Sequence, residues 1–433
     1  MSTSSAPASS AQGESSPTSI TDRVQNQVKL ATETIGGIRV PEFVLFFLLI
    51  AYSVLPIPSL GFPLSHLIMA VLVALSLLRR PTRAFGTREW VLPVFAIGLA
   101  YVSVVSLYAT PTEFAADWKG RALRIAVTFM LAMVIGSGRI CLKSGLFGLL
   151  AALFLNVPLF LAGLLPAPYG EYLTGFIGDK NVAGMIYCIV GILALTVIRN
   201  TWAQFLLVAF LSYSLWLTGS RTSMTAFACA LVWILVAPKL PVLLRWLLGA
   251  GIYFAVELLS EDYSQIGVFS DREGSDLLRA RIDAAAEIKT QQAGFFGEGL
   301  GEAYVVLLDD PGKAWFFHNS YLTALVEGGW PWLVVLMLLT CGVIVRPFTS
   351  KLTRSEVVAQ AAGVAMLVCA TRLGEVFFTS TWAILLGAAL YAASPVRSGA
   401  ESASHGPDRE RALSTDADRT APVGRREVTA YGG

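Results

Sequence analysis

The sequence predicts an all-α integral membrane protein. Its 433 residues are 55% hydrophobic and 14% charged, with a mean hydropathy of +0.63, whereas a typical soluble domain is about 25% charged. Long apolar runs alternate with short polar breaks along most of the chain. A helix that crosses a bilayer needs about 20 mostly apolar residues. These runs approach that length and lack the polar face that a soluble amphipathic helix would carry.

We expect about twelve spans between two polar tails. They lie near 42–58, 62–78, 90–108, 122–137, 145–165, 181–198, 202–218, 223–237, 242–259, 319–345, 357–372 and 375–393. The first apolar run begins too far into the chain for a cleaved secretory signal. The chain then divides into an N-terminal tail that is disordered or lies at the membrane interface, a membrane domain, and a disordered cytoplasmic tail, at 1–40, 41–395 and 396–433.

The basic residues of the short loops predict the orientation. Cytoplasmic loops of membrane proteins carry an excess of lysine and arginine. With the N-terminus inside, every loop on the cytoplasmic side is basic, with Arg79, Arg80, Arg83, Arg88, Arg139, Lys143, Arg199, Lys239, Arg245, Arg346, Lys351 and Arg354. We therefore expect both termini in the cytoplasm and the one large loop, residues 260–317, on the outer face.

The large outer loop is acidic, with eleven aspartates and glutamates against five basic residues. That balance argues against nucleic acid as a partner. Within the loop, residues 275–292 predict a helix with Ser275 or Asp276 as its N-cap, and a narrow apolar stripe that suits packing on the membrane surface or the bundle. The glycine-rich stretch GEGLG follows. It lacks the spacing of a dinucleotide-binding fingerprint, and a turn that approaches the membrane is its simplest interpretation, although an anion-binding nest stays an alternative.

The cysteines predict neither disulfides nor a metal site. All five lie in apolar runs or beside one, their number is odd, and none falls in the large outer loop. We expect no metal and no cofactor.

Arg221 lies in LTGSRTSMTA, a very tight connection between two predicted spans on the outer side. One interpretation is an interfacial anchor whose side chain reaches the headgroups. The other is a fixed cation for an anionic headgroup or a pyrophosphate, because a guanidinium group binds phosphate oxygens through two parallel hydrogen bonds. We favour the second.

Two further arginines lie on the predicted loop helix. Arg279 and Arg281 are two positions apart, so both cannot point the same way. Asp283 follows Arg279 by four residues, and a surface ion pair is its simpler interpretation. Arg281 has Leu277 and Leu278 behind it, on the expected buried side. We favour Arg281 as the functional arginine and keep Arg279 as the alternative.

His318 lies where the polar outer loop meets the apolar run of the next span, in KAWFFHNSYLTALVEGGWPW. Asn319 follows directly, and Glu327 comes nine residues later, before a Gly-Gly pair. A histidine near a span end is often structural. A neutral imidazole can also accept a proton from a sugar hydroxyl as it attacks. Glu327 would face roughly the opposite side of a straight helix and could serve packing or bind a carbonyl. His66 and His405 have no such neighbours in the sequence.

These motifs together resemble the O-antigen ligase and polymerase superfamily. The first motif, GSRTS, lies in a tight outer loop, and the second, R-x-R, lies on the predicted helix of the large loop. GFFGEGLG follows that helix, and FFHNSYLTALVEGGW begins the next span. GDKNVAGMIY also resembles the family's passage from a loop into a span around an asparagine, here Asn181 beside Lys180. The resemblance is clearest over about 170–345 and covers neither tail.

The resemblance implies an inverting, metal-independent glycosyltransferase. Such enzymes move a glycan from a polyprenyl-pyrophosphate carrier to an acceptor hydroxyl on the outer face. If the roles of the family's residues apply to the matching positions here, Arg221 and Arg281 would bind the pyrophosphate and His318 would be the base. Substrate-binding roles would fall to Lys180, Asn181, Arg279, Asn319 and Glu327. Relatives often carry a tryptophan one turn after the loop arginine, where this chain has Ala285, and this leaves the choice between Arg279 and Arg281 open.

The expected partners are a lipid-linked glycan donor, a glycan or glycolipid acceptor, membrane lipids and envelope polysaccharide assembly proteins. The expected location is the cytoplasmic membrane of a bacterium, with the active site on the extracytoplasmic face. Two other classes stay open, a solute or bicarbonate transporter and a non-catalytic scaffold of a polysaccharide assembly complex. The chain has no matched pair of broken helices of the kind that frames transporter sites. Ligase and polymerase are not separated by the sequence.

Overall fold

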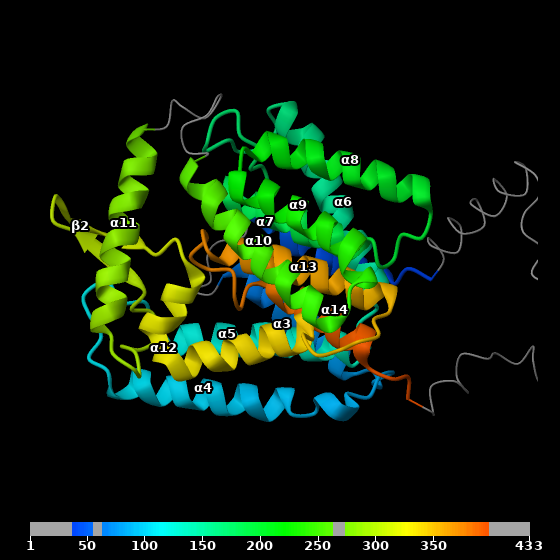
Figure 1. Cartoon of the computed structure of the whole chain (residues 1–433), viewed down its shortest axis with the longest axis horizontal. Coiled ribbons are helices and arrows are strands. Elements are labelled where there is room, and N and C mark those ends of the chain that lie inside the picture. The colour runs from blue at the N-terminus through cyan, green and yellow to red at the C-terminus, as the bar shows by residue number, and fades with distance from the viewer. Residues whose placement is uncertain (1–36, 55–62, 263–272, 398–433) are drawn as a thin grey trace, which may run out of the picture.

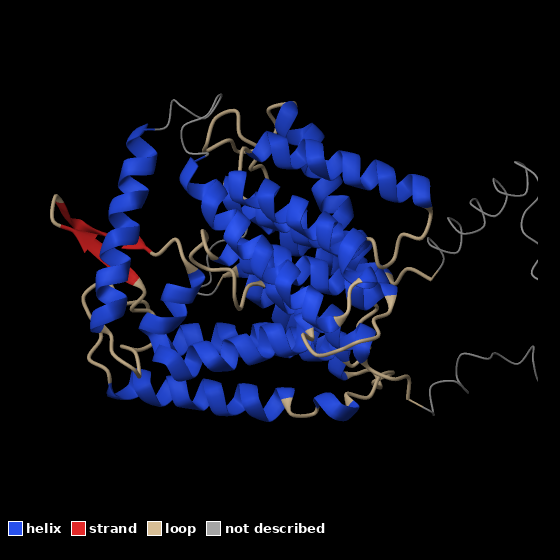
Figure 2. Ribbon diagram, in the orientation of Figure 1, coloured by secondary structure: helices blue, strands red, loops and turns tan. Residues whose placement is uncertain are grey.

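The computed structural model describes residues 37–54, 63–262 and 273–397, and the predicted tails fall almost entirely outside this part of the chain, together with His405. The elements are α2 (Val40–Ala51), η1 (Tyr52–Val54), α3 (Leu64–Leu77), η2 (Gly86–Arg88), α4 (Val91–Tyr108), α5 (Trp118–Gly136), α6 (Leu142–Leu161), α7 (Lys180–Ala194), α8 (Thr201–Thr218), α9 (Arg221–Val236), η3 (Ala237–Lys239), α10 (Val242–Asp262), α11 (Glu273–Gln292), β1 (Tyr304–Leu307), β2 (Asp310–Phe316), α12 (Ser320–Met337), its π-helical continuation η6 (Leu338–Val345), α13 (Arg354–Ala370) and α14 (Ser380–Ala393). The protein is thus mostly helical, as predicted (Figure 2).

A helix of the described chain lies at every predicted span. Within the described residues, five stretches are long and apolar enough to cross a membrane by length and composition: Gly86–Tyr108, Leu142–Leu161, Thr201–Thr218, Arg221–Lys239 and Ser320–Val345. Other apolar helices, such as Val40–Ala51 and Lys180–Ala194, are shorter. The membrane-protein class is supported, and the count of twelve crossings stays a prediction.

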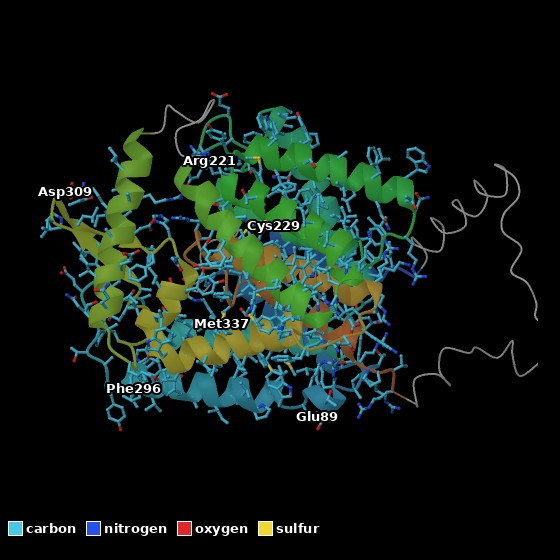
Figure 3. The ribbon with its side chains drawn as sticks, viewed as in Figure 1. Glu89, Arg221, Cys229, Phe296, Asp309 and Met337 are labelled. Atoms are coloured by element: carbon cyan, nitrogen blue, oxygen red, sulfur yellow. The ribbon has the colours of Figure 1, made fainter. Side chains whose placement is uncertain are left out.

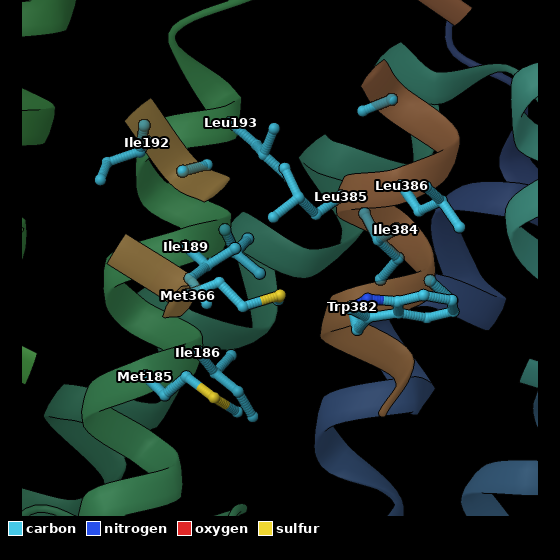
Figure 4. Close-up of a cluster of buried hydrophobic side chains, with 14 of the residues drawn as sticks. Met185, Ile186, Ile189, Ile192, Leu193, Met366, Trp382, Ile384, Leu385 and Leu386 are labelled. Carbon is cyan, nitrogen blue, oxygen red and sulfur yellow. The ribbon is translucent and has the colours of Figure 1, made fainter. Parts of the chain in front are cut away.

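The centre of the bundle is formed by α7, α13 and α14. From Ala183 onward every residue of α7 is buried, in keeping with a helix that is apolar on all sides. Figure 4 shows Met185, Ile186 and Ile189 of α7 near Met366 of α13, with Trp382 of α14 on the facing side. Closely packed apolar side chains of this kind make the centre of the molecule rigid.

Helices at the periphery expose large apolar side chains. Trp202, Phe205, Leu206 and Trp216 of α8 are each more than 60% exposed. Apolar surface on this scale marks contact with a membrane or a partner. The exposed faces of α8, α4 and α10 are therefore the surfaces that lipid would cover.

The loops predicted to lie inside gather at one end of the bundle. Thr82 and Arg83 donate backbone hydrogen bonds to the carbonyl of Ser137, and Arg245 donates to the carbonyls of Thr349 and Ser350. Figure 3 places Glu89 at this end, opposite Arg221, Phe296 and Asp309. We call this end the inner end and the opposite one the outer end, after the orientation that the loop charges predict; the orientation itself stays a prediction.

The outer loop forms a small layer across the other end of the bundle, where α11 runs across the direction of α4 and α12 (Figure 1). The predicted helix is confirmed, although it begins at Glu273, so the expected cap residues Ser275 and Asp276 lie within it. Its buried side chains Ile282 and Ala286 pack against β1, β2 and α12. The predicted apolar stripe consists of Leu278, Ile282, Ala285 and Ile288, and of these Ile288 is instead exposed.

The antiparallel hairpin of β1 and β2 departs from the all-α prediction. Its sequence, YVVLLDDPGKAWFF, places β-branched and aromatic residues on both sides of a short polar stretch, and the chain turns at Leu308 and Asp309. That pattern is a hairpin signal. Val305 and Leu307 of β1 pack with the buried side chains of α11, which explains why a polar loop contains a sheet.

Candidate functional site

His318 is held at a junction of three segments. It precedes α12, whose N-cap Asn319 accepts hydrogen bonds from the backbone of Tyr321 and Leu322 at 2.9 and 3.3 Å. The next turn is attached to the loop between α13 and α14, because Thr323 donates to the carbonyl of Gly374 at 3.0 Å. A side chain at Gly374 would collide with the carbonyl oxygen of Phe317 at 1.8 Å. The imidazole therefore has a fixed position at the outer end of the bundle.

Asp283 of α11 faces this histidine. Its Oδ1 lies 3.7 Å from Nδ1 of His318, and both side chains are about one-third exposed. Within the described residues, Nδ1 is buried and has no hydrogen-bond partner. A carboxylate beside Nδ1 favours the tautomer that carries its proton there, which leaves Nε2 as the basic nitrogen. The sequence suggested Asp283 as a partner for Arg279, and the structure places it against the candidate base instead.

Arg281 points away from the bundle. Its guanidinium group binds Asp309 on the hairpin through two hydrogen bonds of 3.0 and 2.6 Å, and both side chains are more than half exposed. These bonds hold the pKa of Asp309 below its usual range. Arg281 thus forms a surface ion pair at the outer tip of the molecule, which Asp309 marks in Figure 3.

Arg279 faces the loop before α7. It is half-buried. Its positive charge acts to lower the pKa of the Tyr169 phenol, although Asp179 and burial raise that pKa by more. Tyr169 donates to Asp179 at 2.7 Å, and this hydrogen bond is the main reason that its pKa rises to about 12. Arg279, the alternative of the sequence interpretation, is therefore the arginine of α11 whose charge acts on the loop before α7.

The start of α7 adds two predicted residues to this region. Asp179 caps the helix and accepts from the backbone of Asn181 and Val182 at 2.8 and 2.9 Å. The Lys180 ammonium lies over the rings of Tyr172 and Tyr169, at 4.4 and 5.5 Å from their centroids. Lys180, Asn181 and Arg279 are thereby gathered around one acidic cap.

Arg221 begins α9 at the same end of the molecule (Figure 3). Its neighbour Ser220 is the N-cap and shares a hydrogen bond of 2.9 Å with the hydroxyl of Ser223. Arg221 itself is half-buried. A backbone bond from Leu173 to Leu217 joins the loop before α7 to the end of α8. The first turns of α7 and α9 therefore present their cations from adjoining positions.

A long groove opens between α10, η6 and α13. Its volume is about 830 Å³. Asn319, Thr371 and Arg372 line its outer part, and Arg245 and Arg346 line its inner part. Between them the walls are mainly apolar, with Trp246, Tyr253, Val256, Tyr321 and Leu367. The groove thus connects the His318 junction with the opposite end of the bundle along an apolar path.

Glu327 has a structural partner that sequence reasoning missed. It is buried, and Arg121 of α5 meets it with Nε to Oε1 at 2.6 Å. Arg121 also binds Glu375, in the loop between α13 and α14, at 2.6 Å. The positive charge of Arg121 lowers the pKa of Glu375. Among the described residues, one guanidinium group therefore joins α5, α12 and this loop.

The Gly-Gly pair after Glu327 admits the glycine-rich turn of the outer loop. Gly329 has a φ of +64°, and a side chain there would meet the carbonyl oxygen of Phe295 at 1.9 Å. Glu327 accepts from the backbone of Gly301 at 2.9 Å, and Leu300 donates to Ser106 at 2.8 Å. Protein groups thus satisfy these two amides of the turn, which supports the interpretation as a turn packed on the bundle.

His66 also has neighbours that the sequence did not reveal. It lines a second cavity, of about 380 Å³, beside the loop between α13 and α14. Arg121, Arg124, Glu327 and Glu375 line the same cavity. The signal in the sequence was the pair Arg121 and Arg124 at the start of an apolar run on the outer side, against the positive-inside bias.

No model of a known protein family matches the chain, and no curated protein matches it.

Proposed function

We propose that the protein is a membrane-embedded glycosyltransferase of the bacterial cytoplasmic membrane, which moves a glycan from a polyprenyl-pyrophosphate carrier to an acceptor hydroxyl on the outer face. One observation carries this proposal. His318, with a carboxylate facing Nδ1, is adjacent to Asn319 at the outer end of an apolar groove about 830 Å³ in volume. A lipid-linked donor and a water-borne acceptor need such a meeting point.

The chemistry assigns a role to each group. Nε2 of His318 takes the proton of the acceptor hydroxyl as its oxygen forms a bond to the anomeric carbon. The bond from that carbon to the pyrophosphate oxygen breaks, and the electron pair leaves with the lipid pyrophosphate. Attack from the face opposite the leaving group inverts the anomeric centre. Asp283 stabilises the imidazolium that forms.

The departing pyrophosphate needs fixed cations where its charge develops. Arg221 and Lys180 begin α9 and α7, Arg279 lies within the first two turns of α11, and Arg372 lines the outer part of the groove. Guanidinium groups are suited to phosphate oxygens because they donate two parallel hydrogen bonds. The apolar groove would take part of the isoprenoid chain, since its walls match a hydrocarbon.

The direct test uses purified full-length protein and a radiolabelled polyprenyl-pyrophosphate glycan. Transfer of label to an acceptor supports an enzyme. Binding of the labelled lipid without turnover would instead identify a scaffold of an envelope polysaccharide assembly complex. Glycan profiles of a deletion strain separate the two enzyme types, because single repeats indicate a polymerase and long chains on the carrier indicate a ligase.

A transporter is the second candidate. The buried pair of Arg121 and Glu327 favours it, because ionisable groups within membrane helices often mark a transport path. Uptake of labelled bicarbonate by vesicles containing the protein, abolished in Glu327→Gln, would support transport. Glycan transfer without uptake would reject it.

A further inference from the structure

The second cavity lies on the other side of the α13–α14 loop from the groove. This loop contributes Arg372 to the groove and Glu375 to the cavity. The cavity volume of about 380 Å³ is near the lower end of the range for small-molecule sites, about 300–1,000 Å³. Residues near the outer ends of α3, α5, α7 and α14 line it. It is therefore a compact chamber next to the proposed reaction site.

The charged groups of this chamber are balanced. Arg121 and Arg124 face Glu327 and Glu375, and Arg121 is bonded to both carboxylates. Within the described chain no hydrogen bond to the Arg124 guanidinium is found, although its charge acts on Glu375. A charged group enclosed by the chamber would meet a like charge, whichever its sign, so the enclosed part of a ligand should be neutral. A neutral ligand with many hydroxyls can accept from Arg124 and donate to Glu375.

The remaining walls fit the flat face of a sugar ring. Tyr52, Phe377 and Phe378 line the chamber together with aliphatic side chains. Phe378 has a φ of +58°, a rare backbone conformation for a bulky residue, and its ring stacks on Trp332 at 5.3 Å. Such strain is retained where the surroundings impose it, and it clusters at binding sites. The serine hydroxyls of Ser65 and Ser380 add polar groups along the edge.

We propose that this chamber binds one sugar unit of the glycan substrates, with Arg124 and Glu375 binding vicinal hydroxyls and the aromatic side chains covering a ring face. The inference that the chamber binds a sugar depends only on the residues that line it. The assignment of the sugar to a glycan substrate rests on the proposed function. The sugar has two possible sources, the donor, where it is attached to phosphate, and the acceptor, where it is not.

The test is saturation-transfer NMR with full-length protein in detergent micelles. The probes are the methyl α-glycosides of glucose, galactose, mannose and rhamnose, together with α-D-glucose 1-phosphate. Ser65→Phe fills the chamber without changing charge, and Arg124→Met removes the unbonded guanidinium. Ser65→Phe should abolish the signal because its ring occupies the space of the sugar. Arg124→Met should reduce the signal about tenfold, since a lost charge-assisted hydrogen bond changes affinity by about that factor. Ser212→Phe on the exposed face of α8 and Arg80→Met at the inner end are the matched controls.

A signal from any probe that both chamber variants remove, and both controls keep, supports the proposal. The phosphorylated sugar giving the stronger signal would identify the donor as the source, and methyl glycosides giving it would identify the acceptor. Absence of signal from all five probes, or a signal unchanged in Ser65→Phe, would overturn it. Sugar binding without glycan transfer in the turnover assay would support the chamber and reject the proposed function, so the two failures are separable.

Discussion

The arginines at the two ends of the bundle are held in different ways. At the inner end three of the guanidinium groups bind backbone carbonyls: those of Arg83, Arg88 and Arg139 donate to Ser394, Ala393 and Leu77 at 2.9, 2.6 and 3.1 Å. The carbonyls at helix C-terminal ends lack intrahelical partners. These arginines therefore complete the hydrogen bonding of the fold.

At the outer end the arginines meet carboxylates and line cavities, as Arg79 and Arg346 of the inner end also do through Glu42 and Glu356. Arg121 binds Glu327 and Glu375, Arg124 faces the second cavity and Arg372 the groove. Arg281 is different from these, because its partner Asp309 is an exposed surface residue. A guanidinium group beside a cavity can exchange partners when a ligand enters, whereas one bonded to the backbone cannot do so without opening a helix end.

The difference teaches that a positive charge near a membrane surface has two separable uses. The positive-inside rule does not distinguish an arginine that binds backbone carbonyls from one that lines a cavity. Inner arginines should affect folding, and outer arginines should affect turnover in a protein that folds normally. The substitutions below test this division, from the largest expected effect to the smallest.

His318→Ala should lower turnover of a labelled lipid-linked glycan by about 10²–10⁴-fold, the usual contribution of a general base. Binding of the donor lipid should survive, because the cations and the groove are unchanged. His318→Gln keeps a hydrogen-bonding group without a basic nitrogen and should be nearly as poor. Turnover close to wild type in the Gln variant would show that His318 only positions the acceptor.

Arg221→Lys should lower turnover about 10–100-fold, since a point charge replaces the paired hydrogen bonds of a guanidinium group, each worth about 1.5–3 kcal/mol with a charged partner. The control is the same change at the inner end, Arg83→Lys, where a single bond to the carbonyl of Ser394 can re-form. Steady-state rates at matched expression measure both. Equal losses in the two variants would contradict the division between the ends.

Arg245→Ala should lower stability by about 2–3 kcal/mol and leave the rate per folded molecule near wild type. Arg245 is 8% exposed and donates three hydrogen bonds, to Leu240, Thr349 and Ser350. Its removal loses three hydrogen bonds whose acceptors lie in half-buried or exposed residues, and each such bond contributes about 1 kcal/mol net. Thermal unfolding in detergent measures the change. A normal melting temperature with lost turnover would refute the structural role.

Arg279→Lys and Arg281→Lys discriminate between two arginines of one helix. The first should lower turnover several-fold, because Arg279 faces the cap of α7 through Tyr169 and Asp179. The second should remain within about twofold, as expected for an exposed ion pair. The reverse order of effects would restore Arg281 as the phosphate ligand.

Glu375→Gln should change the pH dependence of stability by a small amount. Arg121 lowers the pKa of Glu375 in the folded protein relative to about 4.3 for an unfolded chain. The ion pair therefore stabilises the fold fully above that unfolded value, and its contribution is lost as pH falls through the lowered pKa. The carboxylate is 65% exposed, so solvent weakens the effect. The difference in melting temperature between wild type and variant should vanish in acid, and a difference that persists there would exclude this pair as its cause.

Several features of the site could be read from the sequence because they are local. A capping asparagine followed by an apolar run marks the start of α12 and hence the position of His318. The helix of the outer loop follows from its spacing of apolar residues. GSRTS places Arg221 at a helix start for the same reason. Each of these signals spans only a few turns of chain.

The contacts that give these residues partners are not local. Arg121 and Glu375 are 254 positions apart, and Arg281 reaches Asp309 across 28. Asp283 was assigned to Arg279 because helical neighbours are the only pairs that spacing reveals. Its true neighbour, His318, comes from a segment that the hairpin brings back beneath α11.

The sequence by itself determined that this is a helical membrane protein, which loops share an end, and where its outer cations and its histidine lie along the chain. Hydrophobic length and loop charge carry that information without any knowledge of packing. Only the tertiary structure decided which carboxylate faces His318, which arginine of α11 turns inward, and that two cavities flank one loop. Those outcomes depend on how helices distant in sequence pack together, and packing is a property of pairs of surfaces that no single segment specifies.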